Sequence, residues 1–282
     1  MNWLTRSRAP LGIATSFVSV DLKPCRAKPL KTQFATWSEP PSSPSLCRGD
    51  VDLWVIGLDL SDDQETKFLD TLDFGERERA HRFRFAKDRK HFVAAHGYLR
   101  LVMSRYLETK AEQLRFCYGA YGKPALGGEH QNSGLRFNMS HSHGIVLYAL
   151  TIGRELGVDV EHIRPDFACD EIAQRFFSRF EVESFSRLPS NQKPTAFFRC
   201  WTRKEAYIKA TGRGLSQPLD GFDVTLAPGE PAALLRADGG AEALARWFLY
   251  DLEVGNDYSA ALAVAGPAAN IRYWRGPQWS LL

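Results

Sequence analysis

Gly157-Val158-Asp159-Val160-Glu161 is the stretch of sequence around which the rest of the chain can be arranged. It lies in a predicted strand, where successive side chains point to opposite faces. Val158 and Val160 therefore share one face, and the carboxylates of Asp159 and Glu161 lie side by side on the other. Two adjacent hard oxygen donors suit a metal ion, although an ordinary half-exposed strand shows the same alternation.

This strand also begins the second of two similar runs of elements. The first run contains a strand, one or two amphipathic helices and three short strands, at residues 51–60, 76–107, 113–118, 135–139 and 144–152. The second run repeats that order at residues 156–161, 170–177, 195–211, 222–226, 247–254 and 259–265. The repeated order favours an α+β fold of two pseudo-symmetric halves, with a ligand site in the cleft between them.

The element boundaries place one half at residues 50–153 and the other at residues 154–268. Residues 1–49 lack sustained periodicity and end in a segment rich in proline and serine, which predicts an N-terminal extension or linker that is poorly ordered in part. Residues 269–282 are predicted to form a C-terminal tail.

The composition is typical of a globular protein, with 44% hydrophobic and 24% charged residues among 282. A formal net charge of +3 is too small for a dedicated nucleic-acid binder and suits an anionic ligand or acidic partner. The five cysteines include no Cys-x-x-Cys pair, which argues against disulfides or zinc and favours a reducing cytoplasm. No segment approaches the roughly 20 apolar residues of a membrane span, and no clear cleavable signal is present, so we expect neither membrane attachment nor secretion.

A second group of charged residues lies on the predicted helix at 195–211. In Trp201-Thr202-Arg203-Lys204-Glu205-Ala206-Tyr207-Ile208-Lys209, Glu205 and Lys209 follow one edge of an apolar stripe. They could form a surface pair, which stabilises a helix by about 0.2–0.5 kcal/mol. Beside a buried stripe they could instead line a cleft, where a carboxylate binds metal and an ammonium binds phosphate. A third carboxylate would suit Mg²⁺, which keeps coordination positions for water and phosphate.

Polar residues also follow the predicted strand at 135–139. Asn138-Met139-Ser140-His141-Ser142-His143 places hydroxyl groups and imidazoles where an anionic ligand could meet them. The His-x-His pair has no third ligand nearby, which favours hydrogen-bonded loop residues over a metal site.

Further basic residues lie upstream. The turn Tyr121-Gly122-Lys123-Pro124 could present Lys123 to a ligand. One face of the helical stretch at 76–107 is basic, and this face is either solvated or phosphate-binding. No phosphate-binding P-loop, dinucleotide fingerprint or nucleophile elbow occurs in the sequence, so standard nucleotide-fold and hydrolase interpretations lack support.

Taken together, these segments resemble the ordered motif set of the 4′-phosphopantetheinyl transferases, above all the Sfp-type group. The matching segments are Gly122-Lys123-Pro124, Asn138-Met139-Ser140-His141-Ser142, Gly157-Val158-Asp159-Val160-Glu161 and the helix from Trp201 to Lys209, continued by Gly212-Arg213-Gly214-Leu215-Ser216-Gln217-Pro218-Leu219-Asp220. Each motif is weakly specific, and their order makes the set strong. The resemblance covers about residues 51–265 and implies the phosphopantetheinyl transferase fold, a monomer with its active site between two pseudo-symmetric halves.

The resemblance implies roles for individual residues. Asp159, Glu161 and Glu205 are the implied ligands of Mg²⁺, which Mn²⁺ can replace. Lys209 and Ser140 are implied to contact the pyrophosphate of coenzyme A, and His141 and Lys123 to belong to the coenzyme A pocket. The 3′-phosphate is implied to bind basic residues of the helical stretch, where Glu76 stands at a position that can be lysine in relatives. The candidates are Arg77, Arg79, Arg82, Lys90 and His91.

The implied reaction transfers phosphopantetheine from coenzyme A to a serine of an apo acyl or peptidyl carrier protein, as in fatty-acid, polyketide or nonribosomal-peptide biosynthesis, and releases 3′,5′-ADP. Glu205, directly or through a metal-bound water, is the implied base, and Lys209 the second catalytic residue. A Mg²⁺-dependent phosphohydrolase would also use three carboxylates and a lysine. A non-catalytic module that binds coenzyme A or carrier protein is a third interpretation, against which the intact carboxylates argue.

Overall fold

The first half begins with a strand that is apolar on both faces. The computed structural model describes residues 37–276, and six consecutive residues of β1 (Asp50–Gly57) are buried. Three helices follow, α1 (Asp62–Thr71), α2 (Phe74–His81) and α3 (Ala86–Leu107). Ser61 and Asp73 start α1 and α2 with capping boxes, which satisfy backbone N–H groups that the helix itself leaves unpaired. The helical stretch predicted at 76–107 is therefore two helices.

Four strands complete this half: β2 (Phe116–Tyr118), β3 (Pro124–Leu126), β4 (Leu135–Ser142) and β5 (Ile145–Ile152). Short 3₁₀ turns occur at Ala111–Gln113 and Gly128–His130. The strand predicted at 113–118 is shorter than expected, because the first of these turns occupies its start. The Leu114 carbonyl, just after that turn, accepts a hydrogen bond from the buried guanidinium of Arg100 at 3.0 Å.

The second half follows directly after β5. Its elements are β6 (Leu156–His162), α4 (Cys169–Phe176), α5 (Arg179–Ser186), α6 (Lys193–Thr211), β7 (Asp223–Val224), β8 (Leu234–Arg236), α7 (Gly240–Arg246), β9 (Trp247–Asp251) and β10 (Tyr258–Ala265), with 3₁₀ turns at Gly214–Ser216 and Leu219–Gly221. Helix α6 ends at Gly212, whose φ of 70° lies in the left-handed region that glycine adopts readily.

The two halves share one strand order. The first sheet contains β1-β5-β4 and the second β6-β10-β9, and all these pairs are antiparallel. In both halves the first strand thus pairs with the last, and a long helix (α3 or α6) precedes a small hairpin (β2–β3 or β7–β8). The predicted α+β fold of two similar halves is confirmed.

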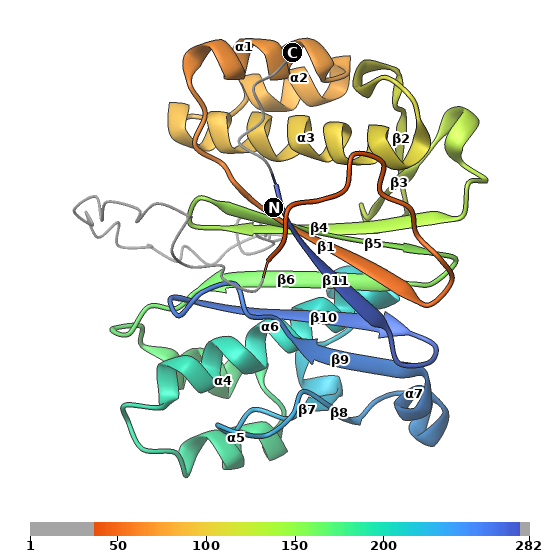
Figure 1. Ribbon diagram of the computed structural model, residues 1–282. Helices are drawn as coiled ribbons and strands as arrows, with labels where there is room; N and C mark the ends of the chain where they lie inside the picture. Colours follow the sequence, from red (N-terminus) through yellow and green to blue (C-terminus); the bar gives the residue numbers. More distant parts are fainter. Residues whose placement is uncertain (1–36, 277–282) are drawn as a thin grey trace.

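The sheets pack face to face between two layers of helices (Figure 1). Leu53 and Leu147 of the first sheet belong to one buried cluster with Val158 and Leu262 of the second. Helices α1 to α3 cover the outer face of the first sheet, and α6 covers that of the second. The strand face that carries Val158 is therefore fully enclosed.

The predicted C-terminal tail needs a correction. Its described part contains β11 (Asn270–Arg275), which extends the first sheet by parallel pairing with β1. An unpaired edge of β1 would expose backbone polar groups, and the Arg272 guanidinium adds an ion pair with buried Asp52 at 2.6 Å. Of the predicted extension, Trp37 is buried and Ser38 bridges to Trp274. Residues 1–36 and 277–282 lie outside the described part of the chain.

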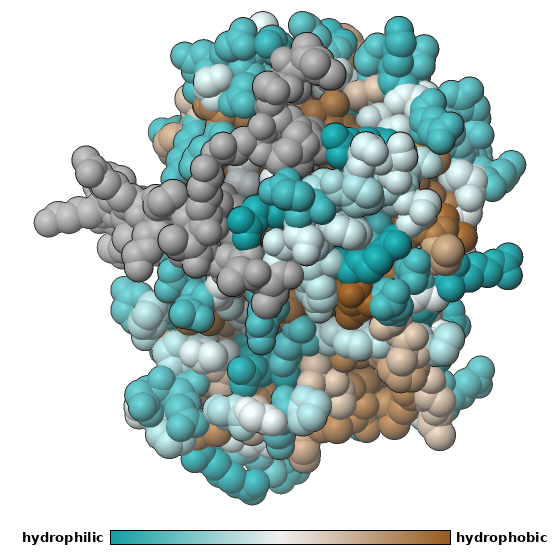
Figure 2. Space-filling model, viewed as in Figure 1, coloured by the Kyte–Doolittle hydropathy of each residue, from teal (hydrophilic) through white to brown (hydrophobic). Residues whose placement is uncertain are grey.

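On the face shown in Figure 2, many of the described side chains are polar. Figure 2 shows apolar side chains gathering on one face over β9 and α7, and Leu235 of β8 and Leu244 of α7 are among the exposed large apolar residues. No helix within residues 37–276 is long and apolar enough to cross a membrane.

Candidate active site

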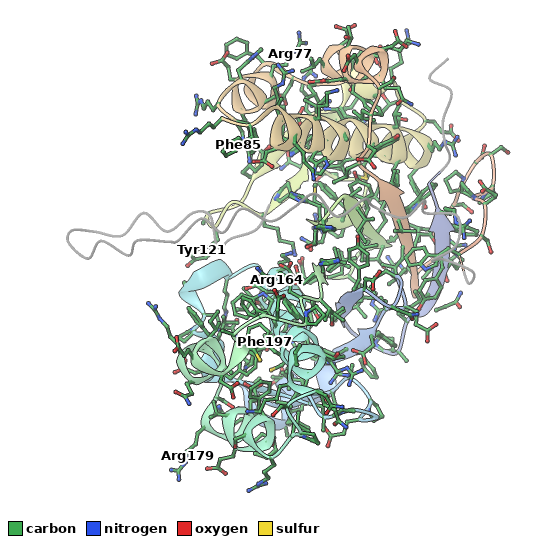
Figure 3. The ribbon with its side chains drawn as sticks, turned by 90° about the vertical axis from the view of Figure 1, so that its left-hand side faces the viewer. Arg77, Phe85, Tyr121, Arg164, Arg179 and Phe197 are labelled. Carbon is green, nitrogen blue, oxygen red and sulfur yellow. The ribbon has the colours of Figure 1, made fainter. Side chains whose placement is uncertain are left out.

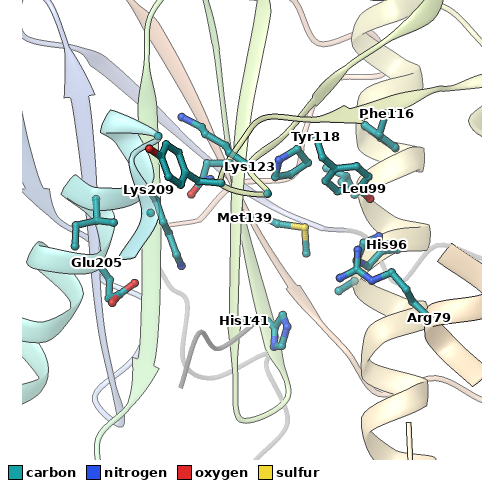
Figure 4. Close-up of a pocket in the computed structure, with 18 of the residues that line it drawn as sticks. Arg79, His96, Leu99, Phe116, Tyr118, Lys123, Met139, His141, Glu205 and Lys209 are labelled. Atoms are coloured by element: carbon teal, nitrogen blue, oxygen red, sulfur yellow. The ribbon is translucent and has the colours of Figure 1, made fainter. Parts of the chain in front are cut away.

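A cavity of about 820 Å³ lies between the two halves. Helices α2 and α3, the β2–β3 hairpin and β4 line it from the first half, and α6 lines it from the second. In Figure 4, Glu205 and Lys209 lie on one side, His96 and Arg79 on the opposite side, and Met139 and His141 between them. This volume is within the range of small-molecule and cofactor sites. The predicted cleft between the halves therefore exists.

The alternation predicted for β6 is confirmed, but its carboxylate face is not exposed. Val158 and Val160 pack between the sheets, while Asp159 faces α6 and is 2% exposed. Glu161 is half-buried near the end of the strand. The ordinary half-exposed strand is thus excluded, because α6 covers this face.

Gly157 explains how α6 comes so close to β6. A Cβ atom at this position would lie 2.2 Å from the Ala206 carbonyl oxygen and 2.4 Å from the Ala210 nitrogen, both of the helix backbone. Glycine is therefore required by close backbone approach. That contact places Asp159 beside the side chains of α6.

Lys209 pairs with Asp159 and not with its helix neighbour. Its Nζ lies 2.6 Å from Asp159 Oδ1 and donates to Ser140 Oγ at 3.0 Å. The Ser140 hydroxyl in turn donates to Asp159 Oδ1 at 2.7 Å. Among the described residues no ion pair joins Lys209 to Glu205, so the simple surface pair is not what the structure contains. Strand β4 and helix α6 together hold the Asp159 carboxylate.

Glu205 is 6% exposed and lines the cavity. Burial, and then the charge of Asp159, raises the pKa of Glu205 to about 7, against the opposing effect of Lys209. Burial and Asp159 also raise the pKa of Glu161 to about 7, while the Ser142 hydroxyl lowers it. The three carboxyl groups therefore lie close enough to interact electrostatically.

These carboxylates fit a hard divalent cation. Within residues 37–276 no group of three or more His, Cys, Asp or Glu side chains is arranged to hold a metal ion as it stands. Oxygen donors are nevertheless available: Asp159 Oδ2 is buried without a hydrogen-bond partner. The Lys209 ammonium supplies positive charge to the other oxygen of Asp159. These carboxylates are partly or fully buried and repel one another, and a bound cation would relieve that repulsion.

The turn predicted to present Lys123 forms between β2 and β3, with Gly122 at φ 78°. Lys123 lines the cavity, and its Nζ donates to the carbonyls of Leu156 at 3.1 Å and Ala210 at 3.3 Å. Burial lowers the pKa of this ammonium. Lys123 thus ties the hairpin to β6 and to the C-terminal end of α6.

The two histidines of the His-x-His pair lie in different environments. His141 lines the cavity from β4, and burial holds its pKa well below its usual range, so the imidazole is neutral near pH 7. His143 is exposed at the β4–β5 turn and stacks on His162, with ring centroids 4.1 Å apart.

Of the basic residues predicted to bind the 3′-phosphate from α2 and α3, some line the cavity and others do not. Arg79 lines the cavity and stacks over Phe92. Arg77, Arg82 and Lys90 do not line it. Arg77 Nε donates to the Leu72 carbonyl, and Arg82 is exposed. Lys90 Nζ forms an ion pair with Asp62 of α1 at 2.5 Å. Figure 3 shows Arg77 on the outer helical layer and Tyr121 between the two halves.

Comparison with known proteins identifies the family. A family model for the 4′-phosphopantetheinyl transferase superfamily matches residues 155–263, and a model for the N-terminal part of 4′-phosphopantetheinyl transferases matches residues 61–152. The 4′-phosphopantetheinyl transferase HetI of Nostoc is 39% identical over 239 residues, which cover 85% of this chain and 98% of HetI. The chain belongs to the 4′-phosphopantetheinyl transferase superfamily.

Other similar proteins are more distant. The 4′-phosphopantetheinyl transferase Sfp of Bacillus subtilis is 29% identical over 208 residues, covering 74% of this chain and 88% of Sfp. The holo-[acyl-carrier-protein] synthase of Thermotoga maritima is a solved structure with a TM-score of 0.31 and 20% identity, covering 39% of this chain and 62% of that one. The predicted resemblance and the enzyme class, 4′-phosphopantetheinyl transferase, are confirmed.

In this phosphopantetheinyl transferase, sequence reasoning missed the role of Glu76. Its carboxylate is 2% exposed, lies 2.7 Å from Nη2 of fully buried Arg100, and meets His96 Nδ1 at 2.9 Å. Glu76 and His96 both line the cavity. The i to i+20 and i to i+24 spacings gave no periodic signal. The capping position of Glu76 three residues after Asp73 was the one local clue.

Two charged residues beside Glu205 were also missed. Lys204 is fully buried and lies 2.7 Å from Glu181 of α5. Arg203, equally buried, forms an ion pair with Asp251 of β9 at 2.6 Å. They attach α6 to its own half, so Glu205 projects from a firmly held helix.

Proposed function

We propose that this protein transfers the 4′-phosphopantetheine arm of coenzyme A to a serine hydroxyl of an apo acyl or peptidyl carrier protein. The serine oxygen bonds to the pantetheine-side phosphorus, the pyrophosphate bond breaks, and 3′,5′-ADP leaves. The supporting observation is that Glu205 and Lys209 line a cavity shared by both halves, and that Lys209 is paired with the buried Asp159 carboxylate just behind that lining. Family membership supports the same reaction.

Lys209 and Ser140 are proposed to meet the pyrophosphate. The Lys209 ammonium donates to one carboxylate oxygen, one hydroxyl and, at 3.3 Å, the Val158 carbonyl. When a cation neutralises Asp159, the ammonium can turn to a phosphate oxygen. Phosphoryl transfer depends mainly on positioning and charge neutralisation, which these groups supply.

Asp159, Glu161 and Glu205 are proposed to hold Mg²⁺, or Mn²⁺ in its place. When bound, the ion would neutralise charge on the pyrophosphate. Glu205, directly or through a metal-bound water, is proposed as the base for the serine proton, because its carboxylate lines the cavity beside the proposed phosphate contacts.

The nucleotide of coenzyme A is proposed to lie toward α3 and the β2–β3 hairpin. Apolar side chains line that side, among them Phe92, Leu99 and Phe116, and Arg79 adds a cation for the 3′-phosphate. His141 and Lys123 are proposed to contact the ligand between the two sides.

Roles for Arg77, Arg82 and Lys90 at the 3′-phosphate stay predictions. If they bind it, charge removal will narrow the difference in affinity between coenzyme A and its 3′-dephospho form.

The direct test incubates the purified protein with coenzyme A, Mg²⁺ and a panel of apo carrier proteins, followed by intact mass measurement. Addition of one phosphopantetheine to a carrier, with release of 3′,5′-ADP, is the expected result. Breakdown of coenzyme A without any carrier would instead indicate a phosphohydrolase. Tight coenzyme A binding with no turnover on any carrier would indicate a binding module.

We also propose that the monomer is the active form, because both halves of the cavity belong to one chain. Size-exclusion chromatography with light scattering should give the monomer mass under assay conditions.

A further inference from the structure

Three alternate side chains of β4 face β6. Asn138 and Ser140 are buried and Ser142 is half-buried. Strands β4 and β6 are edge strands of different sheets, since β4 pairs with β5 and β6 with β10. No backbone hydrogen-bond ladder joins β4 to β6, so these side chains connect the two halves at this place.

The contacts run in register along β6. Asn138 Oδ1 accepts from the Val158 backbone N–H at 2.9 Å, and Ser142 Oγ accepts from the His162 N–H at 3.1 Å. The two acceptors are four residues apart and so are the two donors, which is twice the two-residue repeat of a strand face. Both N–H groups lie on the edge of β6 that β10 does not pair, where unmet donors are costly. Between these contacts, Ser140 donates to Asp159.

Ser142 differs from Asn138 because its oxygen has a second partner. A serine hydroxyl has one proton and two acceptor lone pairs. The His162 N–H uses a lone pair, and the proton is donated to Glu161 Oε2 at 2.9 Å. The backbone of β6 thus fixes the hydroxyl, and the hydroxyl fixes one oxygen of Glu161.

We propose that Ser142 is a positioning residue for Glu161. By holding Oε2, it keeps the half-buried carboxylate in one orientation and leaves Oε1 for a cation shared with Asp159 and Glu205. Without the hydroxyl, Glu161 is free to rotate away from its repelling neighbours. The inference rests on the metal assignment of the proposed function, and it concerns metal affinity and not the transfer step.

The experiment measures Mn²⁺ binding by electron paramagnetic resonance, without coenzyme A or carrier protein. Ser142→Ala should raise the Mn²⁺ dissociation constant about tenfold, as loss of a hydrogen bond to a metal ligand commonly does. Ser142→Thr keeps the hydroxyl and should restore affinity to within about threefold of the original protein. Ser142→Cys, similar in shape but a weak donor, should behave like Ser142→Ala and serves if the alanine variant does not fold.

Thr151→Val is the matched control. The buried Thr151 hydroxyl donates to the Asp50 carbonyl at 2.7 Å and lies opposite Arg136 of β4. Arg136 and Ser142 are six positions apart, roughly 20 Å along a strand. This variant also loses a strand hydroxyl, and it should lose thermal stability without a change in Mn²⁺ affinity.

Steady-state assays add a second measurement. At Ser142→Ala the apparent KM for Mg²⁺ should rise more than kcat at saturating Mg²⁺ falls. The proposal would be overturned if folded Ser142→Ala had an unchanged Mn²⁺ dissociation constant. It would also be overturned if Thr151→Val lost as much Mn²⁺ affinity as Ser142→Ala. An original protein that binds no Mn²⁺ would overturn it together with the metal assignment. If the protein binds Mn²⁺ but transfers no phosphopantetheine, the proposed function alone fails and the Ser142 result stands.

Discussion

Lys209 Nζ lies 2.6 Å from Asp159 Oδ1, across the contact between α6 and β6. Both side chains are largely buried, with 11% of Lys209 and 3% of Asp159 exposed. A buried carboxylate needs a positive partner, and here the ammonium provides it. The carboxylate that holds Lys209 is also the one that we assign to the metal, through its other oxygen, Oδ2. The ammonium and the cation are therefore expected to compete for the negative charge of Asp159.

Lys209→Ala should destabilise the fold by about 3 kcal/mol in the absence of metal, because Asp159 is left buried and unpaired. Added Mg²⁺ should recover part of this loss. Adding Asp159→Asn to Lys209→Ala should cost far less than the sum of the single changes. Urea unfolding of the original protein, the two single variants and the double variant, with and without Mg²⁺, measures the coupling between Lys209 and Asp159. Additive losses of stability would show that the pair is not an energetic unit.

Lys209→Ala should also weaken coenzyme A binding and slow transfer together.

Glu205→Gln should lower kcat by about 100-fold or more and leave coenzyme A affinity within about threefold, since it removes basicity but little volume. Glu183→Gln is the control, because Glu183 forms an exposed pair with Arg179 on α5, a different helix. Steady-state rates and calorimetry on both folded variants check this. Equal kinetics for the two variants would exclude Glu205 as the base.

Gly157→Ala should destabilise the protein by at least about 1–3 kcal/mol, because the new methyl group overlaps the α6 backbone. Activity at saturating substrate should fall as well, since α6 and Asp159 move apart. Gly221→Ala is the control, because a Cβ there would meet only Pro218 Cβ, at 3.9 Å. Thermal unfolding of both variants tests the contact, and a well-tolerated Gly157→Ala would argue that α6 can shift freely.

Glu76 should make the fold sensitive to acid. Burial alone would raise its pKa, but the hydrogen bond from His96 and the charge of Arg100 outweigh burial and lower it below the usual 4.5. The folded state therefore binds the Glu76 proton more weakly than the unfolded chain does. The stabilisation is complete above pH 4.5 and is lost as the pH falls through the folded pKa.

Glu76→Gln should therefore cost about 1–3 kcal/mol at pH 7, because Arg100 loses a charged partner. The difference in unfolding free energy between the two proteins should shrink as the pH falls below about 4.5. Urea titrations between neutral and acidic pH measure it. A difference that stays constant with pH would mean that the Glu76 charge contributes nothing.

The sequence by itself determined the repeated α+β order and the shared face of Asp159 and Glu161. It also placed Gly122 in a turn and Glu205 and Lys209 on one helix. These features depend on strand and helix periods and on local turn chemistry, which neighbouring residues encode. The motif order was specific enough to indicate the family that the comparisons confirm.

Only the tertiary structure decided which charges meet. Lys209 pairs with Asp159 on another element, and Glu76 turns to Arg100. Residues Asn270–Arg275, predicted as tail, complete the first sheet. A period fixes the face on which a residue lies but not the element that packs against it. That element is chosen by burial and close approach over long sequence separations, as at Gly157, where a missing side chain lets α6 reach β6.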